Sequence, residues 1–179
     1  AKNLFEEVFP LYRLLQHRRN VWSDRLFKNV IGSQPYDVVV SSDLGESYIE
    51  IRTADRDYEE VQRMRYFTTH SSVPAIGKVS SEGTKRKGFS ITVEQDAVLH
   101  SQIVEEKVEK VRSAVIEKCQ KEYHHSTALL VHFSDYVAFS EPDDHDCMDK
   151  LLSDIECTFR SRFSELYIVG ASGRNVWIK

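Results

Sequence analysis

The chain has 179 residues, a net charge of −4 at pH 7 and a charged fraction of 29%. These values are typical of a single globular domain and exclude a disordered or fibrous protein. An isoelectric point near 6.0 argues against a protein that coats DNA through its overall charge, since such proteins are usually strongly basic. No apolar run reaches the roughly 18 residues of a membrane span, so we expect no membrane partner.

The three cysteines, Cys119, Cys147 and Cys157, indicate the redox environment. Their odd number, together with an N-terminal segment that lacks the basic and apolar regions of a signal peptide, predicts reduced thiols and a cytoplasmic location. No two cysteines have the CxxC spacing of a structural zinc site. The cysteines therefore give no support to a structural metal centre.

The N-terminal third combines a helical pattern with a hairpin pattern. Residues 3–18 carry an apolar stripe of helical period, in which Pro10 predicts a kink or a restart. We expect a short second helix at 21–30. Two β-branched runs on either side of the turn at 43–46 then predict an antiparallel hairpin over 36–54.

The middle of the chain has weaker patterns. Residues 56–70 are typical of a helix. The Ser- and Gly-rich stretch 71–88 indicates a loop or the tip of a long hairpin, followed by a strand at 89–94. We expect the segment at about 56–96 to be an insertion within one domain that spans the whole chain.

The remaining elements alternate between helices and strands. Apolar residues every three or four positions predict a long helix at 97–122, with its charged residues on a solvated face. The continuous apolar run 128–133 indicates a strand that is covered on both faces, as in a parallel sheet. A helix at 145–163 and strands at 166–169 and 175–178 follow. This order predicts an α/β fold with a mixed central sheet flanked by helices.

The hairpin brings three charged residues to one face. With a four-residue turn, Val39 faces Glu50 and Asp37 faces Arg52. Alternation then places Asp37, Glu50 and Arg52 on one face and the β-branched residues on the other. Two carboxylates and a cation on one surface can bind a hard divalent metal ion. The competing interpretation is an ordinary cross-strand ion pair on an exposed sheet face.

This hairpin resembles the motif of the PD-(D/E)xK nuclease superfamily. Asp37 follows Pro35 with one residue between them, and Glu50-Ile51-Arg52 corresponds to the second element of the motif. The order of helix, hairpin, long helix and buried strand is also similar to that family. The resemblance implies a restriction-endonuclease-like fold and hydrolysis of DNA phosphodiesters with Mg²⁺ or Mn²⁺.

The resemblance also implies roles for single residues. Asp37 and Glu50 would be metal ligands, the Ile51 carbonyl a third ligand, and Glu6 or Glu7 on the first helix an additional acid. The family has lysine where this chain has Arg52. Arginine stays protonated in proteins, so Arg52 cannot act as a general base, although it can hold a phosphate with two hydrogen bonds.

Basic residues outside the hairpin suggest where nucleic acid would bind. Lys85, Arg86 and Lys87 in the predicted loop, and Arg63 on the preceding helix, could contact the phosphate backbone. Two other functions remain open at this point. One is a non-catalytic α/β module that binds a partner protein or forms a homodimer. The other is nucleic-acid binding without cleavage.

Overall fold

The computed structural model describes residues 4–30, 32, 34–54, 78–84, 88–94, 99–136 and 138–179. The elements in chain order are η1 (Leu4–Val8), α1 (Phe9–Arg18), β1 (Leu26–Asn29), β2 (Val38–Ser42), β3 (Gly45–Thr53), β4 (Lys78–Thr84), β5 (Gly88–Glu94), α3 (His100–Cys119), β6 (Thr127–Phe133), α4 (Pro142–Arg160), β7 (Leu166–Gly170) and β8 (Val176–Ile178). η1 is a π-helical turn that leads into α1, and Pro10 lies in the first turn of α1. The expectation for Pro10 was a kink or a restart, and the change from π-helix to α-helix next to this proline agrees with the second alternative.

Six strands form one mixed sheet in the order β1-β2-β3-β6-β7-β8. The first three pair antiparallel, β3, β6 and β7 pair parallel, and β8 pairs antiparallel with β7. Every residue of β6 is buried, which confirms the strand expected at 128–133 with both faces covered. The predicted α/β class with a mixed sheet and flanking helices is confirmed at this level.

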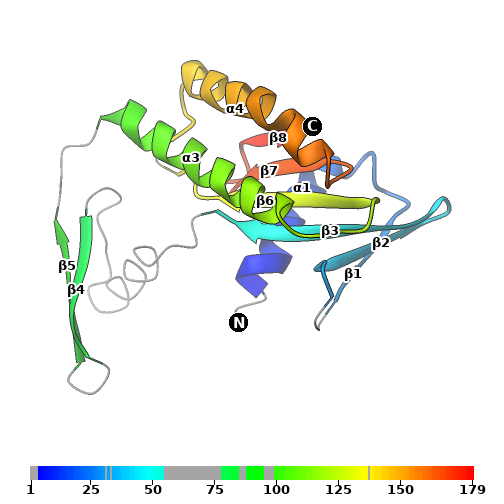
Figure 1. The fold of residues 1–179 in the computed structure, drawn as a ribbon, viewed down its shortest axis with the longest axis horizontal. Coiled ribbons are helices and arrows are strands. Elements are labelled where there is room, and N and C mark those ends of the chain that lie inside the picture. Colours follow the sequence, from blue (N-terminus) through cyan, green and yellow to red (C-terminus); the bar gives the residue numbers. More distant parts are fainter. Residues whose placement is uncertain are drawn as a thin grey trace.

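Helices cover both faces of the sheet. α3 and α4 lie on one face, and α1 lies on the other (Figure 1). β6 contributes to both cores, with Leu129, Val131 and Phe133 packed toward α3 and α4, and Ala128 and Leu130 packed toward α1. This alternation assigns the side chains of every neighbouring strand to one layer or the other.

The hairpin of β2 and β3 is present, but its register differs from the prediction. Ser42 pairs with Gly45 and Val38 with Ile49, so the turn has two residues instead of four. Gly45, with a φ of 119°, supplies the backbone conformation that a turn of this length requires. The predicted pairing of Asp37 with Arg52 is therefore wrong by two residues. A shift of two keeps every side chain on its face, so the faces are as predicted.

The short helix expected at 21–30 is wrong, because residues Leu26–Asn29 form the edge strand β1. Its pairing with β2 lets Phe27 pack against Trp22 and the α1 side of the sheet. The strand expected at 89–94 is β5, which forms a separate two-stranded sheet with β4. The helix expected at 56–70 lies outside the described residues.

Candidate active site

The site is built where β3 extends beyond its neighbour. The pairing of β2 with β3 ends at Val38 and Ile49, whereas β3 continues to Thr53 with β6 on its other side. Asp37, immediately before β2, turns its carboxylate to this open edge. The backbone N–H of Ile51 donates to Asp37 Oδ2 at 2.7 Å. The carboxylate therefore takes the place of a missing strand partner.

A pocket lies at this open edge, between the first turn of the chain, β3 and α3. Residues from these three elements, together with Asp37, line it, and six of the eight are charged: Glu6, Glu7, Asp37, Glu50, Ile51, Arg52, Thr53 and Lys118. The carbonyl of Ile51 faces the same edge as its N–H, because both groups of one strand residue point to the same side. Acidic side chains outnumber basic ones in this lining, which favours a cationic ligand.

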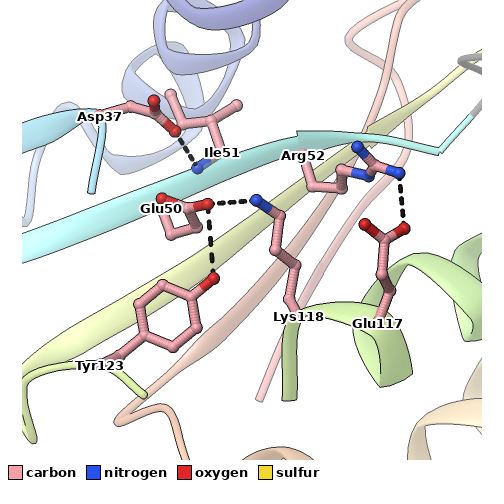
Figure 2. A network of polar contacts seen from close by, with 7 residues as sticks. All are labelled: Asp37, Glu50, Ile51, Arg52, Glu117, Lys118 and Tyr123. Atoms are coloured by element: carbon pink, nitrogen blue, oxygen red, sulfur yellow. Dashed lines mark hydrogen bonds and ion pairs between the residues drawn. The ribbon is translucent and has the colours of Figure 1, made fainter. Parts of the chain in front are cut away.

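Lys118 joins the site from α3 (Figure 2). Its ammonium donates to Glu50 Oε1, and both residues are buried, at 8% and 7% exposure. The hydroxyl of Tyr123 reaches the same carboxylate oxygen at 3.5 Å. The expectation that Lys118 lies on the solvated face of the long helix is therefore wrong.

Burial and nearby charges shift the pKa values of Glu50 and Tyr123. Burial raises the pKa of Glu50, the negative charge of Asp37 raises it further, and the hydrogen bond from Lys118 opposes both effects. Burial, followed by the charge of Glu50, also raises the pKa of Tyr123. Tyr123 is consequently a protonated donor at neutral pH. A cation added beside Glu50 would favour its ionised form.

Arg52 lines the pocket but forms its ion pair with Glu117 of α3, and not with the acids of the pocket. Its guanidinium contacts Glu117 Oε2 at 2.6 Å, with side-chain exposures of 25% and 49% (Figure 2). The competing interpretation required an ion pair between Asp37 and Arg52. The ion pairs of the described residues do not include it. The contact with Glu117 uses one terminal nitrogen of Arg52, so a phosphate at this site would compete with Glu117 for that part of the guanidinium.

The sequence-predicted residues divide into two groups. Asp37, Glu50, Arg52 and Glu7, together with Glu6, line the one pocket. The predicted nucleic-acid ligands Lys85, Arg86, Lys87 and Arg63 lie outside the described residues.

Sequence reasoning missed Lys118 and Tyr123. One signal for Lys118 was available, since it follows the buried residues Val111 and Val115 of α3 at seven and three positions and so lies on their apolar stripe. A lysine on the buried face of a helix requires an acidic partner. The sequence pattern could not name Glu50 as that partner, because 68 residues separate the two.

The donor set suits a partly protein-bound metal ion. The described residues contain no group of three or more His, Cys, Asp or Glu side chains arranged to hold one. Asp37 and Glu50 each keep one carboxylate oxygen beyond those already engaged by Ile51 and Lys118. Mg²⁺ usually takes one or two carboxylates and completes its shell with water and phosphate oxygens. Asp37, Glu50 and the Ile51 carbonyl are oxygen donors of the type that such an ion takes.

Comparisons with protein-family models, with curated proteins and with solved structures found no match to this chain. No helix among the described residues has the length and apolar character needed to cross a membrane.

Proposed function

We propose that this protein is a nuclease-like domain that hydrolyses DNA phosphodiester bonds with Mg²⁺ or Mn²⁺. One observation carries the proposal: the Lys118 ammonium lies against the Glu50 carboxylate at the open edge of β3. The hairpin motif lacks a lysine at position 52, and α3 brings one to the same carboxylate from another element. Two acids, a backbone carbonyl and a lysine thus share one pocket in a mixed α/β domain, for which we also propose the restriction-endonuclease-like fold.

Each group has a separate task in this proposal. Asp37, Glu50 and the Ile51 carbonyl would hold the metal ion, and Glu7 would contribute through a bound water. The ion would lower the pKa of the attacking water and neutralise charge on the phosphate. Lys118 would orient that water. Hydrolysis joins the water oxygen to phosphorus and breaks one phosphorus–sugar oxygen bond, and the leaving oxygen gains a proton.

Arg52 would contribute to binding rather than to proton transfer. A guanidinium can bind a phosphate with two parallel hydrogen bonds. In the structure the guanidinium of Arg52 forms an ion pair with the Glu117 carboxylate. Binding of a phosphate at the pocket would replace the Glu117 carboxylate as the partner of Arg52. We therefore expect substitution of Glu117 to strengthen, not weaken, substrate binding.

The competing proposal is a non-catalytic module that binds nucleic acid, a partner protein or a second copy of itself. Both cations at the pocket already have carboxylate partners, Lys118 with Glu50 and Arg52 with Glu117. Ion pairs that neutralise these cations within the protein are also expected of a domain that no longer binds a metal ion but keeps the fold. Metal binding and cleavage decide between the two proposals.

The test measures metal binding and cleavage on the same variants. Manganese at about 100 times its dissociation constant should raise the melting temperature of the parent protein by about 5 °C or more. Asp37→Asn should abolish this shift, since asparagine retains an acceptor for Ile51 but no charge. Cleavage of labelled single-stranded and duplex DNA should fall at least about 100-fold in Asp37→Asn and in Lys118→Gln.

Asp43→Asn is the matched control, because Asp43 is an exposed acid in the turn of the same hairpin. It should keep both the manganese shift and the cleavage rate. A parent protein that neither gains stability with manganese nor cuts any DNA form leaves the non-catalytic proposal in its place. Cleavage that survives Asp37→Asn and Glu50→Gln shows that the chemistry lies elsewhere.

A further inference from the structure

The segment from α1 to β1 carries a concentration of positive charge. Residues 9–30 contain four arginines and a lysine but one acidic residue, Asp24, in a chain with net charge −4. Arg13, Arg18 and Arg25 are half-buried on the α1 side of the sheet. We call these three residues the α1 arginine surface.

Within the described part of the chain, the α1 arginine surface has no carboxylate partners. None of its three guanidiniums forms an ion pair with a described residue. The Nε atoms of Arg13 and Arg18 are buried and lack a hydrogen-bond partner within the described part of the chain. One terminal N–H of Arg13 donates to the Gln16 side chain at 3.3 Å. The other terminal N–H groups of these arginines are the ones that could meet an external anion.

Arginines on the opposite face are arranged differently. Arg112 pairs with Asp154 at 3.2 Å, Arg160 with Glu156 at 3.1 Å, and Arg162 with Glu122 at 2.9 Å. Each of these arginines of the α3 and α4 layer therefore has a carboxylate partner. Among the described residues, the lack of a carboxylate partner is thus a feature of the α1 arginine surface and not of every arginine.

Aromatic rings hold the guanidiniums of the α1 arginine surface in place. Arg18 lies over Trp22 at 5.4 Å and over Tyr167 at 5.8 Å, and Arg25 lies over the same tryptophan at 5.4 Å. Stacking leaves the N–H edges of a guanidinium available for in-plane hydrogen bonds. These edges match the oxygens of a phosphate group.

The α1 arginine surface is continuous with the candidate pocket through a single helical segment. Glu6 and Glu7 of η1 line the pocket, and α1 follows η1 directly. Arg13 and Arg18 follow Glu7 by six and eleven residues, or about 9 and 16 Å along a helix. At 3.4 Å per nucleotide of one strand, roughly three to five nucleotides span this distance.

We propose that the α1 arginine surface binds the phosphodiester backbone of the nucleic acid whose scissile bond enters the pocket. The inference rests on the proposed function for the identity of the polyanion. It names a binding surface different from the basic residues expected from the sequence. Anionic lipid headgroups carry the same phosphate chemistry, and the test separates the two sources.

The test measures the affinity of fluorescein-labelled 20-nucleotide DNA, single-stranded and duplex, by fluorescence anisotropy in EDTA. The triple variant Arg13→Gln/Arg18→Gln/Arg25→Gln should bind at least about tenfold more weakly. Its salt dependence should have a slope smaller by about 2 to 3, because each phosphate contact contributes about 0.7–0.9. The matched control Arg112→Gln/Arg160→Gln/Arg162→Gln removes the same number of charges from the other face and should bind as the parent does.

A second measurement covers the case in which the triple variant does not fold. Hydrogen exchange of the parent protein with and without DNA should show protection in residues 9–28 and none in α4. Unchanged affinity in the triple variant, or protection confined to other segments, overturns the inference. Retention on phosphatidylserine vesicles through these arginines, with no retention of DNA, assigns the surface to lipid and also overturns it.

Failure of the α1 arginine surface can be told apart from failure of the proposed nuclease function. Affinity is measured in EDTA, where metal-dependent cleavage cannot occur, so the result for the triple variant does not depend on the nuclease chemistry. Arginine-dependent binding by a protein that never cuts DNA supports the surface and rejects the nuclease. Cleavage at the parent rate in the triple variant supports the nuclease and rejects the surface.

Discussion

At the scale of single residues, Glu50 and Lys118 form the contact on which the site depends. Both are almost fully buried, and each would be an isolated charge without the other. Removal of one member of a buried ion pair usually costs more than the pair contributes, since the remaining charge stays desolvated. The pair therefore holds the end of α3 against β3 as well as setting the charge of the pocket.

Lys118→Met should lower the free energy of unfolding at pH 7 by about 3 kcal/mol. The loss should shrink as the pH falls. Burial raises the pKa of Glu50 above its ordinary 4.5, so ionised Glu50 opposes folding, and stability decreases as the pH rises through that raised pKa. Without Lys118 the pKa is higher still and the decrease is larger. Urea denaturation between pH 4 and 8 measures this difference.

Lys121→Met provides the control, because Lys121 is exposed and lies just beyond the end of α3. The charge of Lys121 lowers the pKa of Glu50 only slightly and without a contact, so the variant should change the unfolding free energy at pH 7 by less than about 0.5 kcal/mol. An equal loss in both variants would mean that the general charge of this segment matters, and not the contact with Glu50.

At the scale of elements, one histidine–aspartate pair ties the beginnings of α3 and α4 together. His100 Nε2 lies 3.0 and 2.9 Å from the two carboxylate oxygens of Asp144. The backbone N–H of Glu141 also donates to Asp144, at 3.2 Å. Burial acts to raise the pKa of Asp144, but these hydrogen bonds overcome it and leave the pKa below its ordinary value. The two helices that cover one face of the sheet thus begin at a shared anchor.

Asp144→Asn should destabilise the protein by about 1–2 kcal/mol at pH 7, through loss of the charged acceptor at a helix start. Because the pKa of Asp144 is lowered, its stabilisation is complete above the unfolded value of 3.8 and is lost as the pH falls through the lower folded value. The difference between parent and variant should therefore vanish in strong acid. Asp143→Asn, the exposed neighbour, should be nearly neutral throughout, and an equal effect would reject the role of the pair.

Local patterns predicted most elements but not their pairing. β6 was predictable because its seven residues are all buried and apolar enough to form a continuous run. β1 was not, because only Phe27 of its four residues faces the core and the strand has no alternating pattern. The hairpin register depended on a two-residue turn, which the backbone of Gly45 decides. The contact of Lys118 with Glu50 lies beyond any local pattern.

At the scale of the whole molecule, the chain divides into a three-layer core and a small separate sheet. β4 and β5 pair only with each other among the described strands (Figure 1). Both lie within the segment that the sequence analysis expected to be an insertion. Among the described residues, none of the six strands of the core sheet comes from that segment.

Replacement of residues 56–97 by about ten Gly and Ser residues, with an average span of about 18 Å, should leave the core folded. We expect one cooperative urea transition with a free energy within about 2 kcal/mol of the parent, since shortening a loop changes closure entropy only slowly. The same variant lacks Arg63, Lys85, Arg86 and Lys87, so its affinity for DNA measures what those residues add. A non-cooperative transition would show that the segment supports the core.

The open edge of β3 has a consequence for solubility. An unpaired stretch of backbone at the side of a strand is a template for a strand from another molecule. Here the Asp37 carboxylate occupies the Ile51 amide, and the acids of the pocket surround that edge with negative charge. A second copy that offered the same edge would bring like charges together and compete for an amide that is already bonded. The carboxylates proposed for chemistry thus also protect this sheet from edge-to-edge polymerisation.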